Sequence, residues 1–108
     1  MHSYIFLLRE REFCRFNENV YKIGKTNQDP NDMLSGYPKG TQLILFINTH
    51  DYHVIENKLI YIFKNIFTQR IDIGKKYFEG DKNYMVKIIL DVINNNNEHD
   101  NKDNEHNN

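Results

Sequence analysis

The chain has 108 residues, 39% hydrophobic and 13% aromatic, which is enough for one domain with a core. Its 14 basic and 15 acidic residues nearly cancel, but residues 94–108 carry a net −3 and residues 1–93 a net +2, which permits nucleic-acid binding without requiring it. A single cysteine excludes an intramolecular disulfide. The sequence has no apolar segment long enough for a transmembrane helix and no signal peptide, so we expect an intracellular protein, cytosolic or nuclear.

Two strands are predicted at the start of the chain. Residues 3–9 are apolar on both faces, which favours a central strand. Residues 10–19 form a charged connection, in which Asn17 and Asn19 favour a turn. Residues 20–25 are predicted as a second strand, antiparallel to the first.

A short helix and a third strand follow. Asp29-Pro30 is a typical helix start, because proline suits the first helical position. Gly36 and Pro38 end this helix soon after it begins. Residues 42–48 are apolar on both faces and predict the third strand.

The second half of the chain carries two helical patterns. The long helix is predicted from Asp51 as N-cap and from an apolar stripe at helical spacing: Ile55, Leu59, Ile62, Phe63 and Ile66. Residues 70–80 are predicted as a loop or short strand. A second helix over residues 82–93 has its own stripe: Met85, Ile88, Ile89 and Val92.

The last segment, residues 94–108, contains no apolar side chain. Such a segment gains too little burial to offset the entropy of ordering, so we predict a disordered, asparagine-rich acidic tail. The rest, residues 1–93, is predicted to be one α/β domain: a small three-stranded antiparallel sheet flanked by helices.

Three motifs carry the functional signal. They are Tyr4-Ile5-Phe6, Lys22-Ile23-Gly24 and, further on, Tyr77-Phe78-Glu79. In this order they resemble the GIY-YIG nuclease superfamily, and most closely the subfamily of phages and large DNA viruses whose second motif reads K-I-G. The resemblance covers residues 3–81. It implies a GIY-YIG-like domain that hydrolyses DNA with one divalent metal, Mg²⁺ or Mn²⁺, inside an infected host cell if the protein is viral.

The resemblance also implies the site residues. Glu56 matches the long-helix glutamate that holds the metal, and Lys22 opens the second motif. Met33 stands where an arginine steadies the phosphate, and Phe6 replaces the tyrosine of the first motif. We therefore take Phe6, Lys22, Met33 and Glu56 as the catalytic positions, with Glu56 as metal ligand, and expect them to line one cleft between the sheet and the long helix.

Each of these residues also has an ordinary structural interpretation. Glu56 could be an exposed helix glutamate, Lys22 an edge-strand lysine, and Phe6 and Met33 packed apolar residues. The spacing of His50, His53 and Glu56 could present a metal on a helix. However, His50 lies before the expected helix start, which favours solvated histidines.

Three functions remain open. Losing a guanidinium and a phenol removes transition-state stabilisation, at ~3 kcal/mol per charged donor. The leading hypothesis is therefore a degraded nuclease site that still binds DNA without sequence preference and has no membrane role. The lysines expected to contact DNA are Lys22, Lys25, Lys39 and Lys58. The alternatives are an active endonuclease dependent on Mg²⁺ or Mn²⁺, and a non-catalytic protein-interaction domain.

Overall fold

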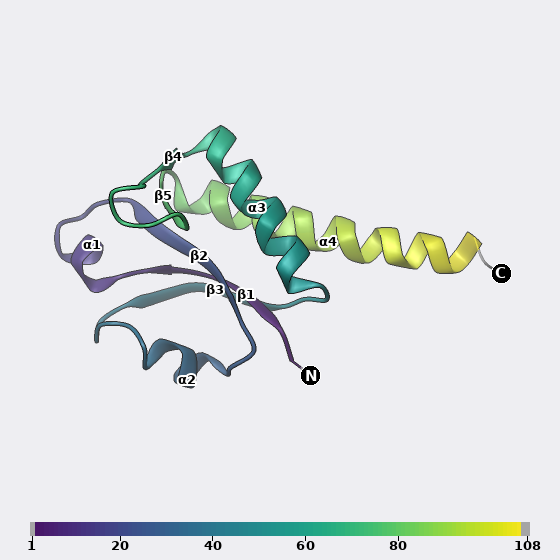
Figure 1. Cartoon of the computed structure of the whole chain (residues 1–108), viewed down its shortest axis with the longest axis horizontal. Coiled ribbons are helices and arrows are strands. Elements are labelled where there is room, and N and C mark those ends of the chain that lie inside the picture. The colour runs from purple at the N-terminus through teal and green to yellow at the C-terminus, as the bar shows by residue number, and fades with distance from the viewer. Residues whose placement is uncertain (1, 107–108) are drawn as a thin grey trace.

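A computed structural model describes the backbone of residues 2–106 and the side chains of residues 2–96. Helices α3 and α4 cover one face of a sheet and α2 covers the other, which gives an α/β fold (Figure 1). The elements in chain order are β1 (Tyr4–Arg9), α1 (Arg11–Arg15), β2 (Val20–Thr26), α2 (Pro30–Leu34), β3 (Gln42–Asn48), α3 (Tyr52–Ile66), β4 (Thr68–Gln69), β5 (Tyr77–Glu79) and α4 (Lys82–His106).

The sheet has five antiparallel strands in the order β3-β1-β2-β5-β4. The three longer strands lie where the sequence predicts them, and β1 has the expected central place between β2 and β3. The prediction of a three-stranded sheet is wrong, because β4 and β5 extend it beyond β2. These strands have two and three residues, too few for an alternating pattern to be recognised.

Strand alternation creates two separate cores. Ile5 and Leu7 face α3 and α4 in the larger core, whereas Phe6 and Leu8 face the side of α2. Strand β2 divides in the same way, because Phe6 lies directly opposite Gly24 and Leu7 opposite Ile23. Residues next to each other in a motif therefore serve opposite faces of the sheet.

Gly24 is required by the packing of Phe6. The ring of Phe6 lies against the Cα of Gly24, so that a Cβ added there would clash with the ring. The glycine of the second motif therefore makes room for the aromatic residue of the first motif. The backbone of Gly24 needs no positive φ, since Gly40 is the glycine that has one among the described residues.

The helix starts are mostly as predicted. Helix α2 begins with Pro30, and the Asp29 carboxylate accepts a hydrogen bond of 2.9 Å from the backbone N–H of Asp32. Asp51 takes the N-cap position of α3, but its φ is 51° and its side chain makes no capping bond. The α3 stripe is buried at Ile55, Leu59 and Phe63 but ends in an exposed Ile66.

Two segments differ from the prediction. The connection over residues 10–19 contains the five-residue helix α1, followed by a turn at Asn17 with a φ of 53°. Helix α4 buries Ile93 and continues to His106, so the backbone of the predicted tail is helical up to that residue. The side chains of residues 97–106 and all of residues 107–108 lie outside the described part. That residues 94–108 are dispensable stays a prediction.

Among residues 2–106, none of the helices combines the length and the apolar content needed to cross a bilayer.

Candidate functional site

Glu56 is a buried carboxylate held by two lysines. Only 2% of the residue is exposed, on the side of α3 that faces the sheet. Its Oε1 lies 3.1 Å from Nζ of Lys25, and its Oε2 lies 2.9 Å from Nζ of Lys76. We call Lys25, Glu56 and Lys76 the Glu56 triad. The interpretation of Glu56 as an exposed helix residue is wrong.

The triad joins three elements. Lys25 extends from β2 on the same face as Ile23, towards α3. Lys76 immediately precedes β5, and its carbonyl oxygen accepts a 3.0 Å hydrogen bond from the backbone N–H of Ile23. This backbone bond keeps Lys76 beside β2, where its side chain reaches Glu56. The triad therefore depends on the pairing of β2 with β5, which the sequence did not predict.

Lys22 lies on the other face of β2. Its Nζ donates a 2.7 Å hydrogen bond to the hydroxyl of Tyr37. The same ammonium lies 4.9 Å from the ring centre of Tyr37 and 5.6 Å from that of Tyr77, within the range of a cation–π interaction. We call Lys22, Tyr37 and Tyr77 the Lys22 cluster.

Phe6 and Met33 are buried beneath the Lys22 cluster. Both belong to the small core on the α2 side, where Tyr37 packs at their edge. The rings of Phe6 and Tyr37 meet edge to face with 6.5 Å between their centres. Their interpretation as packed apolar residues agrees with this burial.

The four predicted positions therefore do not share one cleft next to the long helix. Phe6, Lys22 and Met33 lie on the α2 side, and Glu56 lies on the α3 side. The reason is the alternation of β2, which sends Lys22 and Lys25 to opposite faces. The two groups still approach each other, because Lys76 of the triad precedes Tyr77 of the Lys22 cluster in the chain.

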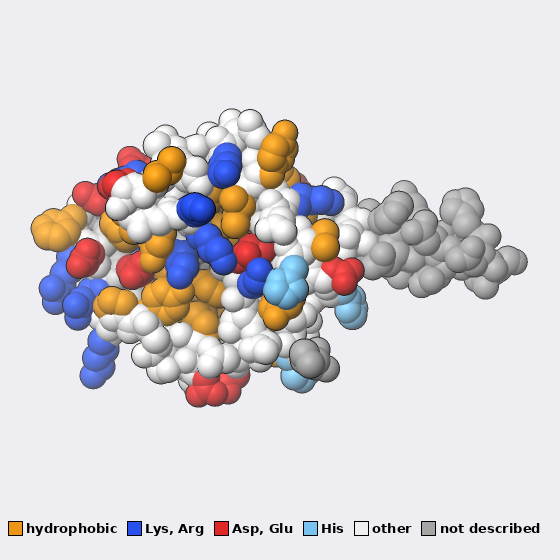
Figure 2. Space-filling model, viewed as in Figure 1, with side chains coloured by type: hydrophobic (Ala, Val, Ile, Leu, Met, Phe, Trp, Pro, Cys, Tyr) orange, Lys and Arg blue, Asp and Glu red, His pale blue; other side chains and the backbone are white. Residues whose placement is uncertain are grey.

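The remaining predicted DNA contacts are exposed. Lys39 lies in the turn before β3, and Lys58 lies on α3 away from the core. Figure 2 shows basic and hydrophobic side chains side by side across the middle of the face in view. Lysines mixed with aromatic and apolar side chains are typical of surfaces that bind nucleic acid.

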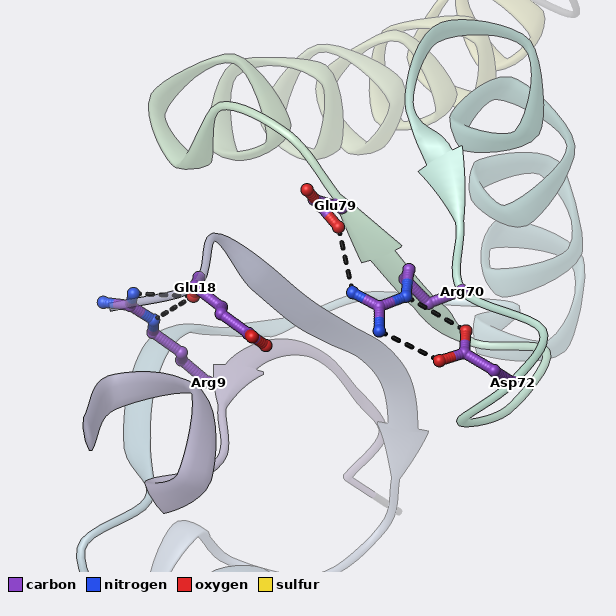
Figure 3. A network of polar contacts seen from close by, with 5 residues as sticks. All are labelled: Arg9, Glu18, Arg70, Asp72 and Glu79. Atoms are coloured by element: carbon purple, nitrogen blue, oxygen red, sulfur yellow. Dashed lines mark hydrogen bonds and ion pairs between the residues drawn. The ribbon is translucent and has the colours of Figure 1, made fainter. Parts of the chain in front are cut away.

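The loop between β4 and β5 is fixed by Arg70. The guanidinium donates to both carboxylate oxygens of Asp72, at 3.0 and 2.9 Å, and to Glu79 at 2.9 Å (Figure 3). The Arg70 guanidinium lowers the pKa of the Asp72 carboxyl below its usual value. The contacts of Arg70 therefore stabilise the loop that carries Lys76.

A second arginine, Arg9, donates two hydrogen bonds to the carbonyl oxygen of Glu18 and so stabilises the connection before β2 (Figure 3).

Tyr77 is poorly suited to act as a base. Burial raises the pKa of its phenol well above the usual value of 10.0, and hydrogen bonding to the Glu10 carboxylate raises it further. The hydroxyl therefore stays protonated at neutral pH and acts as a donor. A protonated tyrosine cannot take a proton from an attacking water.

The residues do not fit a divalent metal. Each oxygen of Glu56 already accepts from a lysine ammonium, which a cation would have to displace against two positive charges. Within the described part of the chain, no three His, Cys, Asp or Glu side chains gather in a way that could hold a metal. His50 and His53 are exposed, and His50 precedes the start of α3.

Sequence reasoning missed the role of Lys76. The only signal was the pair Lys75-Lys76 directly before Tyr77, and nothing in its spacing connects it with Glu56. Nothing in the sequence pattern singles out Tyr37, whose hydroxyl accepts a hydrogen bond from Lys22. These contacts join residues from different elements, so only the folded chain shows them.

Comparisons with protein-family models, with curated proteins and with solved structures find no match to this chain. The GIY-YIG resemblance therefore rests on the motifs Tyr4-Ile5-Phe6, Lys22-Ile23-Gly24 and Tyr77-Phe78-Glu79.

Proposed function

We propose that this GIY-YIG-like domain binds DNA without sequence preference and does not cut it. The observation that carries the proposal is the gathering of three lysines, Lys22, Lys25 and Lys76, with two tyrosines around the junction of β2 and β5. Glu56 offsets one of the three positive charges and Glu10, which bonds Tyr77, offsets a second, so the group keeps a formal charge of +1. Such a group is suited to the DNA backbone, whose phosphates dominate non-specific binding.

The lysines can contact phosphate without leaving their present positions. The side chains of Lys25 and Lys76 keep 26% and 41% of their surface exposed, although each bonds the buried Glu56. Lysine ammoniums recognise phosphate as point charges and do not read base edges. Exposed Lys39 and Lys58 could add further phosphate contacts. This arrangement supports binding that tolerates any sequence.

The chemistry of cutting is poorly supported. Phe6 has no hydroxyl, and Met33 has no guanidinium and is 6% exposed, so neither can act on a bound phosphate. Glu56 is engaged by lysines, and Tyr77 keeps its proton. A phosphodiester bound at these lysines would therefore meet ammonium donors but no free base and no guanidinium among these residues.

Fluorescence anisotropy with a labelled DNA duplex tests the proposal. We expect binding of wild-type protein at low salt that weakens steeply as salt rises. Lys22→Gln should weaken binding and reduce the magnitude of the slope of log K against log salt by about one. The matched control is Lys87→Gln, an exposed lysine of α4, which should change neither value.

Two outcomes would support the alternatives. No binding at ~50 µM protein would exclude ordinary non-specific affinity and favour a protein-interaction domain. Nicking of plasmid DNA by wild-type protein with Mg²⁺ or Mn²⁺, abolished by Glu56→Ala, would instead establish an active endonuclease.

A further inference from the structure

The loop between β4 and β5 exposes two isoleucine side chains to solvent. Ile71 is 73% exposed and Ile73 is 37% exposed. A small domain gains stability by burying such side chains, so two of them in one short loop need an explanation. The other side chains of the loop, residues 70–76, are charged, namely Arg70, Asp72, Lys75 and Lys76, so the two isoleucines are its apolar exceptions.

Hydrogen bonds within the loop stabilise the conformation in which these side chains are exposed. The carbonyl oxygen of Arg70 accepts from the backbone N–H of Ile73 at 2.9 Å and from that of Gly74 at 3.0 Å. Asp72 lies between the two isoleucines in the sequence, and its carboxylate accepts two hydrogen bonds from the Arg70 guanidinium (Figure 3). Gln69 Nε2 donates to the carbonyl oxygen of Lys75 at 2.8 Å. The isoleucines are therefore presented in a fixed geometry.

Glycine at position 74 allows this loop to close onto the Lys22 cluster. A Cβ there would lie 3.0 Å from Cδ2 of Tyr77, closer than ordinary van der Waals contact. The ring of Tyr77 in turn lies beside Lys22. The loop that presents Ile71 and Ile73 is thus continuous with both the Lys22 cluster and the Glu56 triad.

From this placement we propose that residues 70–76 form a rigid apolar wedge that contacts unstacked bases, so that DNA with an extrahelical base is preferred over intact duplex. The inference rests on the proposed DNA binding and specifies its ligand. Lysines at one end of the loop hold the phosphates, and the isoleucines next to them meet the apolar faces of the bases. Isoleucine is among the side chains that enter unstacked base steps.

The charge around the loop favours nucleic acid over an apolar partner. Lys75 and Lys76 follow the isoleucines, and Lys75 is exposed. An apolar protein surface would have to desolvate these ammoniums, whereas DNA offers a phosphate for each of them next to every base. Asp72, which lies between the isoleucines, is paired with Arg70; with Lys75 and Lys76 the loop keeps a formal charge of +2, and this excess favours a polyanion.

The test uses full-length protein and two DNA duplexes, one intact and one with a single extrahelical 2-aminopurine. Wild-type protein should bind the bulged duplex about tenfold more tightly and raise the 2-aminopurine fluorescence as the base leaves the stack. Ile71→Ser should remove this preference while leaving the affinity for intact duplex and the salt slope unchanged. Val54→Ser is the control, since Val54 is 58% exposed on α3 outside the loop.

The outcomes separate the wedge from DNA binding itself. Equal affinity for both duplexes, unaffected by Ile71→Ser, overturns the wedge and leaves the proposed function standing. Failure to bind either duplex overturns both. Ile71-dependent binding to phosphatidylcholine–phosphatidylserine vesicles, without any Ile71 effect on DNA, would overturn the wedge and assign the loop to a membrane surface. Because Ile71 is largely exposed, circular dichroism should show an unchanged fold in the variant.

Discussion

Removing both lysines of the Glu56 triad should destabilise the fold by more than the sum of the two single removals. At an effective dielectric constant of 20, unit charges 2.9 Å apart attract by about 6 kcal/mol. Most of this is offset by desolvation, and loss of one partner from a buried pair destabilises by about 3–5 kcal/mol. Lys25 and Lys76 are partly exposed, and Glu56 keeps the other lysine in each single variant. We therefore expect about 1–2 kcal/mol for Lys25→Met or Lys76→Met alone.

The double variant should lose more than the sum of the singles. With both lysines gone, a carboxylate that is 2% exposed has no charged partner, and the loss should approach the full 3–5 kcal/mol. The excess over additivity, about 1 kcal/mol, measures how the lysines share Glu56. Changing Glu56 to Met in that background should recover most of the loss, because the unpaired charge is then removed.

Urea unfolding followed by far-ultraviolet circular dichroism provides the measurement. Lys87→Met on the exposed side of α4 is the control and should change the free energy of unfolding by less than about 0.5 kcal/mol. If the Lys25→Met/Lys76→Met double variant falls within that same margin of wild type, Glu56 reaches water in solution. The triad would then not be the buried ion group described above.

Three further predictions concern other parts of the chain. Deleting residues 94–108 should leave the thermal midpoint within about 3 °C of wild type in calorimetry, and a larger fall would show that the segment stabilises the core. The pKa of the Asp72 carboxyl, measured by NMR, should lie below 3.8 in wild type and closer to 3.8 in Arg70→Met. Because this pKa is lowered by folding, the ion pair stabilises the loop at pH values above 3.8, and the stabilisation is lost as the pH falls through the folded pKa. Gly24→Ala should destabilise by about 1–3 kcal/mol in urea through its clash with Phe6, and no change would mean that the ring can move aside.

The parts of the fold that sequence reasoning found are those with long repeating patterns. Strands β1, β2 and β3 have six or seven residues each, and α3 has fifteen, so their alternation or helical stripe is visible in the sequence. Strands β4 and β5 have no such pattern, and they form by pairing, β5 with β2 and β4 with β5. That pairing depends on where the chain returns after α3, which no local pattern specifies.

The site was only partly predictable for the same reason. Glu56 could be selected because the GIY-YIG resemblance points to a glutamate on the long helix. The partners of Glu56 could not be found, because Lys25 is 31 residues and Lys76 is 20 residues away from it. Whether a buried glutamate binds a metal ion or a lysine ammonium depends on the groups that folding brings next to it.

The two lysines around the second motif lie on opposite faces of the sheet. Gly24 must be small to accept Phe6, and Lys22 and Lys25 stand on either side of it along β2. Alternation sends Lys25 to the α3 face, where its ammonium pairs with the buried carboxylate of Glu56. It sends Lys22 to the α2 face, where its ammonium bonds Tyr37 beside a small core that contains Phe6 and Met33. The proposed separation of DNA binding from cutting rests on this arrangement, because both ammoniums are present to meet phosphate, whereas Phe6 offers no hydroxyl and Met33 no guanidinium.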